Sequence, residues 1–476
     1  MKKYSPLAFL FSLLFAVSAY AGEGRYTLPL TGGGWSLWLD KEASWQNDRL
    51  YLPHEITDLS LLPVNTPTGG WQALNDNLDA VSVEVPGTVE EYLTTSDNPR
   101  PEDFKGVSWW YRKITIPADQ ANKRHLIYFE SVRMRAEVYL DGKLVAYDLI
   151  GETPFHVDIT KEAKPGTEQL LAVRVTNPGG NFHWQDFDIQ KWGEYNIPPA
   201  RSFSGIIGRV KLESVNPVFI SDIYMQNTPE PTKVNAIISF TNETPSSVKQ
   251  DVELTVSEKN RPDKVVFRQL LKHVSFPPGK REMMIPVSVS DAKLWDLDTP
   301  ELYTCNIQIK KGKNTLDRDK KNFGFRWFSA EGVGTDAVLR LNGRRVMLRS
   351  AISWGYFPVT GLIATPEMAE KQVLTAKKLG LNMLNFHRCI GSPVVLEKTD
   401  ELGLLYYEEP GSFHSANHDP FIRTIVNEKL KRMVHRDRSH PSLIIFNLIN
   451  EFGGPLSRDK ELVAKRMNDM REAHAV

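Results

Sequence analysis

The sequence has few cysteines, no excess of charge of either sign and no metal-binding Cys/His spacing. Its 476 residues include only Cys305 and Cys389, which excludes a disulfide-rich scaffold and gives no zinc-type pattern. Lysine plus arginine equals aspartate plus glutamate at 58 each, so no net field attracts nucleic acid or an anionic membrane. With 41% hydrophobic and 24% charged residues, the composition is that of a folded chain. Its partner is expected to be neutral or modestly charged.

Residues 1–21 differ from the rest of the chain. Two lysines precede the apolar run "PLAFLFSLLFAVSAY", which ends in the small-residue pattern "AYA". Because the run is shorter than the roughly 20 residues of a membrane-spanning helix, a cleaved secretory signal is favoured over an uncleaved anchor. The protein is therefore expected to be periplasmic or secreted, without membrane association after cleavage. No disulfide is expected, since Cys305 and Cys389 fall in different predicted domains.

The next two regions have the pattern of β-structure. From 22 to 216, short segments rich in Val, Ile, Tyr, Trp and Phe are separated by Gly, Pro, Asp and Asn, which is typical of an antiparallel all-β domain. Asp141-Gly142 predicts a type I′ hairpin turn. Residues 217–328 continue with segments such as "VNAIISF" and "YTCNIQI" between polar turns, which predicts a small β-sandwich.

From 329 to 476, apolar runs alternate with helical patterns. In "TPEMAEKQVLTAKKLG", Thr365 is the predicted helix cap, Pro366 the first helical residue and Gly380 the stop signal. Counting from "RVMLRSA", about four strand-helix units follow, which predicts parallel strands. An eight-unit (β/α)8 barrel needs about 250 residues, whereas this region has about 148. We therefore expect the first half of a barrel in a shortened chain.

Seven motifs occur in an order that resembles glycoside hydrolase family 2, the β-galactosidase, β-glucuronidase and β-mannosidase family. They are "SWWYRKITIP", "VYLDGKLV" with "TPFHVDIT", "FSGIIGRVKL", "LWDLDTPELY", "FGFRWF", "LNGRRVMLR" and "HRDRSHPSLIIFNLINE". The resemblance covers nearly all of the chain after the signal. It implies a multidomain fold with a jelly-roll sugar-binding domain, an immunoglobulin-like β-sandwich and a TIM barrel that carries the active site.

The resemblance also implies a retaining exo-β-glycosidase that uses two carboxyl groups about 5 to 5.5 Å apart. Glu451, expected at the end of the fourth strand, matches the family acid/base, and Asn450 matches the amide that hydrogen-bonds the sugar 2-hydroxyl. Arg436 and Asp437 belong to the same motif as a structural ion pair. The family nucleophile follows much later in the chain and has no match before Val476. The 476 residues by themselves are therefore expected to be almost inactive.

The second predicted strand departs from the common family pattern. Asn385 stands where many members have an arginine, with His387 and Arg388 nearby, and Trp354 lies where a histidine is usual. His387 and Arg388 are candidate substrate contacts and Trp354 a candidate platform for a sugar ring, although packing roles are equally open for all three. Of the adjacent residues Glu408 and Glu409, one is expected in the pocket and the other in a salt bridge, and the sequence does not say which.

The stretch 182–198, "FHWQDFDIQKWGEYNIP", concentrates aromatic and acidic residues. The resemblance places a loop of this region near the barrel mouth, which makes Asp188 a candidate substrate contact; a purely structural role is the alternative. No metal and no cofactor are implied. Carbohydrate is the expected partner, with β-galactosides favoured over β-glucuronides or β-mannosides by analogy with the family. A non-catalytic carbohydrate-binding protein is the alternative function, and the oligomeric state is open, a homo-oligomer included.

Overall fold

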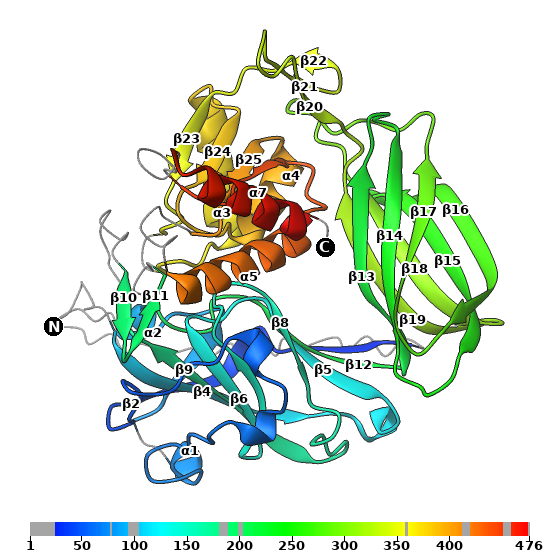
Figure 1. Ribbon diagram of the computed structural model, residues 1–476. Helices are drawn as coiled ribbons and strands as arrows, with labels where there is room; N and C mark the ends of the chain where they lie inside the picture. Colours follow the sequence, from blue (N-terminus) through cyan, green and yellow to red (C-terminus); the bar gives the residue numbers. More distant parts are fainter. Residues whose placement is uncertain are drawn as a thin grey trace, which may run out of the picture.

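The structure is a computed structural model that describes residues 24–76, 79–93, 104–179, 189–198, 203–357, 360–411, 419–450 and 458–474. The predicted signal at 1–21 lies outside these ranges. Figure 1 shows a β-domain at the bottom, a second β-domain at the right and a region of helices and short strands above them. None of the described helices is long and apolar enough to span a membrane.

The first region forms two antiparallel sheets around one core. The six-stranded sheet contains, in spatial order, β3 (Val81–Val85), β2 (Gly32–Asp40), β4 (Gly106–Thr115), β9 (Glu168–Asn177), β6 (Arg135–Leu140) and β7 (Lys143–Asp148). The four-stranded sheet contains β1 (Tyr26–Pro29), β12 (Val210–Val215), β5 (Arg124–Phe129) and β8 (Phe155–Asp158). Short elements connect them: η1 (Pro53–Glu55), η2 (Leu59–Leu61), α1 (Ala73–Asp76), α2 (Val89–Leu93), η3 (Ala118–Gln120) and the hairpin β10 (Gln190–Trp192) with β11 (Tyr195–Ile197).

The predicted hairpin turn is confirmed. Strands β6 and β7 pair in antiparallel register on either side of Asp141 and Gly142, whose φ angles are +48° and +80°. Both values are positive, as a type I′ turn requires, and Asp and Gly adopt that conformation more readily than most residues.

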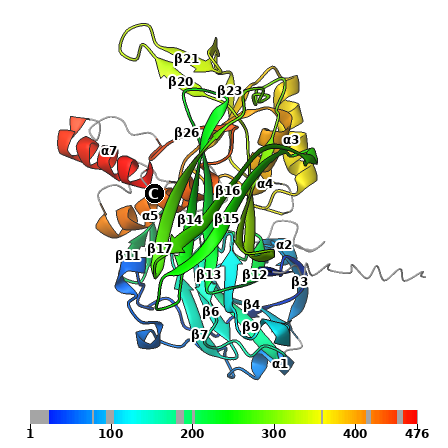
Figure 2. The same ribbon diagram turned by 90° about the vertical axis from the view of Figure 1, so that its right-hand side faces the viewer.

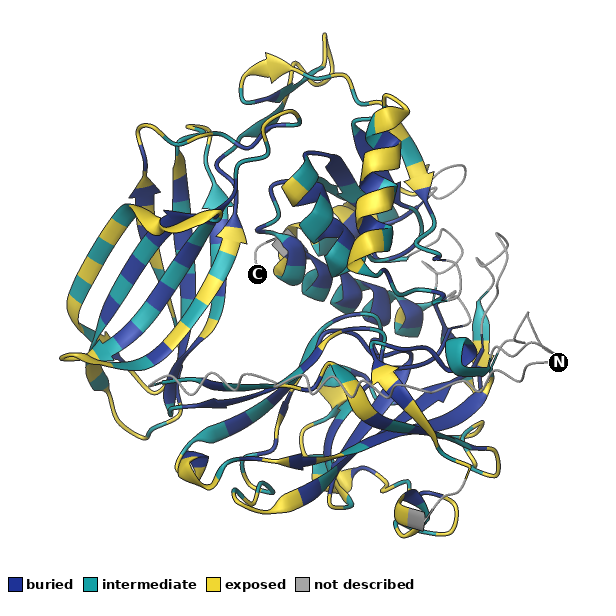
Figure 3. Ribbon diagram, turned by 180° about the vertical axis from the view of Figure 1, so that it is seen from behind, coloured by how far each residue is buried: buried dark blue, intermediate teal, exposed yellow. Residues whose placement is uncertain are grey.

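The second region is a β-sandwich, as predicted, and it has seven strands. One sheet has the order β13 (Val218–Asn227), β14 (Lys233–Asn242) and β17 (Gly279–Ser288). The other has β16 (Arg261–Phe276), β15 (Val248–Glu258), β18 (Tyr303–Lys311) and β19 (Asn314–Phe323). Buried and exposed residues alternate along these strands (Figure 3), because successive side chains point to opposite faces of a sheet.

The third region begins with a small antiparallel sheet of β20 (Phe328–Glu331), β21 (Val338–Leu341) and β22 (Arg344–Arg345), which lies far from the first domain in both Figure 1 and Figure 2. Four parallel strands and their helices follow: β23 (Ser350–Ser353), α3 (Pro366–Lys378), β24 (Met383–Phe386), α4 (Pro393–Leu402), β25 (Leu405–Glu408), α5 (Pro420–Asp437), β26 (Leu443–Phe446) and α7 (Lys460–His474). The spatial order of the strands is their order along the chain.

The helix predicted after Thr365 is confirmed in detail. The Thr365 side chain accepts a hydrogen bond from the backbone N–H of Met368, and Ala369, Val373 and Ala376 are buried. The cap residue, the proline at the first helical position and the apolar spacing all act within one helix, so local chemistry determines this element.

Two strand predictions need correction. The stretch "RVMLRSA" is not one strand, because Arg345 ends β22 in the antiparallel sheet and the parallel strand starts only at Ser350. The fourth strand ends at Phe446, before the predicted site residues. Just after the strand, the Asn447 side chain donates to the Ile449 carbonyl at 2.8 Å. The domain boundaries at 216 and 328 stay predictions.

Polar contacts hold helix α5 against the first domain. Lys429 donates to Glu152 at 2.7 Å, and Arg432 to Asp148 at 2.7 Å. Ile425 joins an apolar cluster with Trp192 and other residues of the first domain. The parallel sheet therefore has a defined position relative to the first β-domain.

Candidate functional site

At the end of strand β25, the side chains of the adjacent residues Glu408 and Glu409 point to opposite sides of the sheet. Successive side chains of a strand point to opposite faces of the sheet. On the helix side, Glu408 accepts hydrogen bonds from the Gly391 N–H at 2.7 Å and Arg436 at 3.4 Å. On the other side, Glu409 accepts a hydrogen bond from the Arg388 N–H at 2.7 Å. Glu408 is thus the residue in the ion pair, and Glu409 lies among the predicted site residues.

Three of the predicted residues converge on the Glu409 carboxylate. The Asn450 side-chain amide donates to Glu409 Oε1 at 3.4 Å, and His387 Nδ1 lies 3.6 Å from the same oxygen. The Arg388 guanidinium donates to Asn450 Oδ1 at 3.1 Å. Residues from the ends of three strands, separated by more than 60 positions in the chain, therefore share one network.

Trp354 completes this group from the end of the first parallel strand. Its ring packs edge-on against His387, with ring centroids 4.6 Å apart, and the Arg388 guanidinium carbon lies 5.6 Å from its ring centroid. Asn385 does not join them, because its amide donates to the Tyr407 carbonyl of the neighbouring strand at 3.4 Å. The cation near Asn450 is therefore Arg388, and position 385, where many family members have an arginine, does not supply one.

Sequence reasoning missed two residues of the network, Asn447 and Tyr407. Asn447 donates to the Tyr407 hydroxyl at 2.6 Å and to Glu409 Oε2 at 3.4 Å. Its position directly after the apolar run "LIIF" was a signal of the same kind as Asn450, since polar residues that follow a buried strand tend to lie at its exposed end.

Burial controls the electrostatics of this network. Glu409 is fully buried, and this raises its pKa above the ordinary value, although the hydrogen bonds from Arg388, Asn450 and Asn447 act in the opposite direction. Burial, together with the Glu409 charge, also raises the pKa of Tyr407 to about 12. Tyr407 is therefore neutral at ordinary pH and donates or accepts hydrogen bonds as a phenol.

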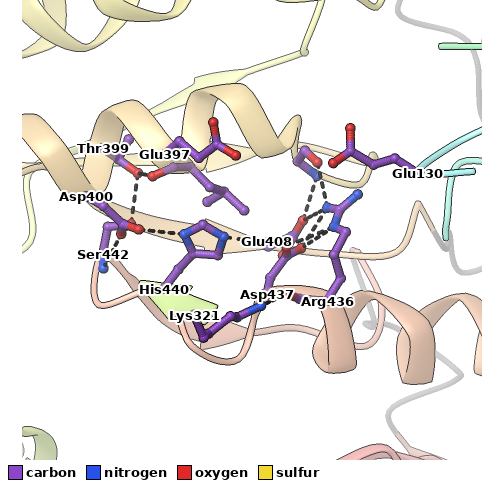
Figure 4. A network of polar contacts seen from close by, with 12 residues as sticks. Glu130, Lys321, Glu397, Thr399, Asp400, Glu408, Arg436, Asp437, His440 and Ser442 are labelled. Atoms are coloured by element: carbon purple, nitrogen blue, oxygen red, sulfur yellow. Dashed lines mark hydrogen bonds and ion pairs between the residues drawn. The ribbon is translucent and has the colours of Figure 1, made fainter. Parts of the chain in front are cut away.

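The opposite face of the sheet carries a buried triad of Glu408, Arg436 and Asp437 (Figure 4). The Arg436 guanidinium donates to both oxygens of Asp437, the shorter contact being 2.7 Å, and to the Gly391 carbonyl at 2.7 Å. The predicted Arg436–Asp437 ion pair is confirmed. Burial and the neighbouring Asp437 raise the pKa of Glu408 well above its ordinary value, and Glu408 Oε2 has no hydrogen-bond partner that the described residues provide.

Glu408→Gln is expected to change the pH dependence of stability. In the folded chain the raised pKa keeps Glu408 protonated above pH 4.5, which is the ordinary pKa at which the same side chain ionises in the unfolded chain. Wild-type stability therefore falls as the pH rises from 4.5 through the raised pKa. Glutamine cannot ionise and avoids this loss, which amounts to about 1.4 kcal/mol per unit by which the pKa is raised. Thermal unfolding midpoints from pH 4 to 8 should therefore favour the variant increasingly. Parallel profiles would contradict this; Glu194→Gln, at an exposed position, is the control.

Glu451 and Asp188 lie outside the described residues, so the structure does not place the predicted acid/base or the first-domain contact. Among the residues that are described, no group of three or more His, Cys, Asp or Glu side chains is arranged to hold a metal ion. Cys305 and Cys389 are both buried and are not joined in a disulfide.

Two family models match the chain. The model for the sugar binding domain of glycosyl hydrolases family 2 matches residues 71–198, and the model described as glycosyl hydrolases family 2 matches residues 218–326. Together they cover parts of both β-domains. The first domain is therefore a sugar-binding domain of this family, and the sandwich is its immunoglobulin-like domain.

Curated relatives agree with the family models. A putative β-glucuronidase of Formosa agariphila is 26% identical over 428 residues, which is 86% of this chain and 45% of that protein. A β-galactosidase of Thermoanaerobacter pseudethanolicus is 28% identical over 375 residues, 78% of this chain and 48% of that protein. The chain thus spans about half the length of these relatives.

Solved structures share the fold. The β-glucuronidase of Bacteroides uniformis aligns with a TM-score of 0.70 and 19% identity over 94% of this chain and 51% of its own. The β-glucuronidase of Ruminococcus gnavus in complex with D-glucaro-d-lactam aligns with a TM-score of 0.70 and 20% identity over 95% of this chain and 71% of its own. Together with the ordered sequence motifs and the two family models, these matches lead to one conclusion: the chain belongs to glycoside hydrolase family 2.

Proposed function

We propose that this chain is the sugar-binding and acid/base part of a retaining exo-β-glycosidase that acts on terminal β-linked sugars. The observation that carries the proposal is the convergence of Asn450, His387 and Arg388 on Glu409 at the carboxyl ends of parallel strands, in a family of glycosidases. In (β/α)8 enzymes active sites lie at that end of the strands. We also propose that β23 to β26 are the first four strands of such a barrel, because their spatial order follows the chain.

The proposed roles follow from the contacts. Asn450 donates or accepts a hydrogen bond at the sugar 2-hydroxyl, a contact that strengthens in an oxocarbenium-like transition state. Glu409 holds the Asn450 amide and the Arg388 backbone in place, so it positions groups that touch substrate. Trp354 offers its ring to a sugar face beside His387. Glu451, the residue after Asn450, serves as acid then base.

The second carboxylate of a retaining enzyme is assigned to no residue of this sequence. Glu408 faces the helices, in an ion pair with Arg436, and Glu409 is already engaged by Arg388, Asn450 and Asn447. Both side chains are fully buried, so neither carboxyl group is exposed to attack a bound sugar. Both residues are therefore proposed to be structural or positioning groups.

β-Galactosides are the first candidate substrate, by analogy with the family. β-Glucuronides are the second, because the putative β-glucuronidase of Formosa agariphila and the β-glucuronidases among the solved structures are similar to this chain. The proposed location is periplasmic or secreted, on the basis of residues 1–21. Amino-terminal sequencing of protein recovered from the periplasm or medium tests this, and an intact Met1 would contradict it.

A substrate panel tests the proposed activity. The protein made from the complete open reading frame is expected to hydrolyse nitrophenyl β-D-galactoside with a kcat/KM at least 10-fold above that for the β-D-mannoside and the α-D-galactoside. A higher value for the β-D-glucuronide would replace the first candidate substrate with the second. Sugar binding in calorimetry without any hydrolysis would instead favour a non-catalytic carbohydrate-binding protein.

A further inference from the structure

A cavity of about 770 Å³ lies where the three regions of the chain meet, away from the strand ends described above. The jelly-roll domain contributes Tyr128, the sandwich contributes Lys320 and Lys321 on β19, and the region around α4 and β26 contributes Glu397 and His440, among other lining residues. Small-molecule sites in proteins usually measure about 300 to 1,000 Å³ and often lie at domain interfaces. The size and place of this cavity are those of a ligand site.

The carboxylates that line the cavity already have cationic partners. The contacts are Glu130 with Arg209 at 2.7 Å, Glu397 with Arg209 at 2.8 Å, Glu401 with Lys259 at 2.8 Å, Asp400 with His440 at 2.6 Å and Asp437 with Arg436 at 2.7 Å. Lys211, a further lining cation, pairs with Glu213 at 2.9 Å. Each carboxylate of the lining therefore has a cationic partner within the protein, and Arg209 serves both Glu130 and Glu397.

The two lysines of β19 are not compensated in this way. Within the described part of the chain, neither Lys320 nor Lys321 has a carboxylate oxygen within 4.0 Å, and Lys321 Nζ makes only a long contact of 3.4 Å with the Arg436 carbonyl. Figure 4 shows Lys321 beside His440 and Arg436. The cavity lining therefore includes two lysines that have no carboxylate partner among the described residues.

Two further donors face the same space. The Tyr128 hydroxyl has no hydrogen-bond partner among the described residues. His440 Nδ1 contacts Asp400 at 2.6 Å, while its Nε2 lies 4.0 Å from Asp437, beyond hydrogen-bond distance. Burial alone would lower the pKa of His440, but Asp400 and Asp437 raise it, which favours the protonated ring with an N–H at Nε2. Several donors without acceptors are suited to an oxyanion with several oxygens.

The volume indicates more than a bare ion. Water occupies about 30 Å³ per molecule in the liquid, so a small inorganic oxyanion would fill only a small part of this cavity. The paired carboxylates Glu397 and Glu401 keep oxygen lone pairs that can accept hydrogen bonds from hydroxyl groups. Uncompensated cations beside carboxylate acceptors are the combination that recognises a polyhydroxylated anion.

We propose that the cavity between the three domains binds an acidic sugar, whose carboxylate or sulfate group lies against Lys320, Lys321, Tyr128 and His440. This second sugar site does not depend on the proposed catalytic function. Because it contacts all three domains, a bound sugar favours their folded arrangement over the separated or unfolded one and raises the apparent stability of the chain by mass action.

Calorimetric titration of the full chain with D-glucuronate, D-galactose 6-sulfate, sodium sulfate and D-galactose tests this. The acidic sugars are expected to bind saturably, at least 10-fold tighter than sulfate and than galactose, and to raise the thermal unfolding midpoint. The variant Lys320→Met/Lys321→Met is expected to weaken acidic-sugar binding at least 10-fold. Lys313→Met, an exposed lysine before the same strand, removes one charge and should leave binding unchanged.

Three results would overturn the proposal. One is the absence of saturable binding of either acidic sugar. Another is sulfate binding as tight as that of the acidic sugars, which would mean an anion site without sugar recognition. The third is binding that Asn450→Ala abolishes and the double lysine variant retains, because the sugar would then occupy the strand ends and not the cavity between the domains.

Discussion

Glu451→Gln is expected to lower kcat for alkyl β-glycosides by about 10²- to 10⁴-fold with little change in KM, when measured on the protein from the complete open reading frame. Glutamine keeps the shape of the side chain but cannot protonate the leaving oxygen. A proton from the acid matters most when the leaving alcohol has a high pKa, and least for a good leaving group such as dinitrophenolate. The loss should therefore be much smaller for the dinitrophenyl glycoside in the glycosylation step.

The dependence on the leaving group distinguishes an acid/base from a residue that only binds sugar. Loss of a binding contact would slow all substrates with the same sugar by a similar factor, because the sugar contact is common to them. An equal loss for every leaving group, or no loss, would remove Glu451 from the proposed role. Glu461→Gln, at an exposed position on α7, makes the same chemical change outside the proposed site and is the control.

Arg436→Met is expected to destabilise the folded chain by about 3 to 5 kcal/mol. The guanidinium is almost fully buried and contacts Asp437, Glu408 and the Gly391 carbonyl. Its removal leaves two buried carboxyl groups next to each other without the cation between them. Methionine retains most of the apolar stem, so lost packing contributes little. Thermal or urea unfolding measures the effect.

A double variant tests the physical reason. In Arg436→Met/Glu408→Gln the side chain at position 408 cannot ionise, so the free energy that the unfolded chain gains near pH 7 by releasing the Glu408 proton is removed. Stability at that pH should therefore be partly recovered, by about 1 kcal/mol or more. Arg345→Met, at an exposed arginine of β22, is the control and should change stability by less than about 0.5 kcal/mol. An Arg436→Met variant as stable as this control would mean that the triad does not hold the region together.

The side chains of the adjacent residues Glu408 and Glu409 point to opposite faces of the sheet. Substitutions of the two residues are therefore expected to affect different properties of the protein. Glu408 and Arg436 lie on the helix side of the sheet, so their substitution is expected to affect stability and its pH dependence. Glu409 lies with His387 and Asn450 at the strand ends, so its substitution would disturb the proposed sugar contacts. The period of two along a strand assigns one residue to the scaffold and its neighbour to the site.

Local chemistry in the sequence was sufficient for several elements. The cap at Thr365 and the apolar spacing after it predict helix α3, and Asp141-Gly142 predicts the β6–β7 turn, because each signal acts over a few residues. The alternation of apolar runs with helical patterns also predicts the parallel strands, and the ordered motifs identify the family. These features depend on contacts between near neighbours in the chain or on patterns that long stretches repeat.

Only the tertiary structure decided how the polar residues are combined. The direction of Glu408 and Glu409 depends on where β25 ends, and the network of Arg388, Glu409 and Asn450 depends on the register of three strands whose residues are far apart in the sequence. The cavity beside Lys320 and Lys321 depends on how three domains dock. Sequence patterns report local periodicity and burial, whereas these arrangements arise from long-range packing, which no single segment encodes.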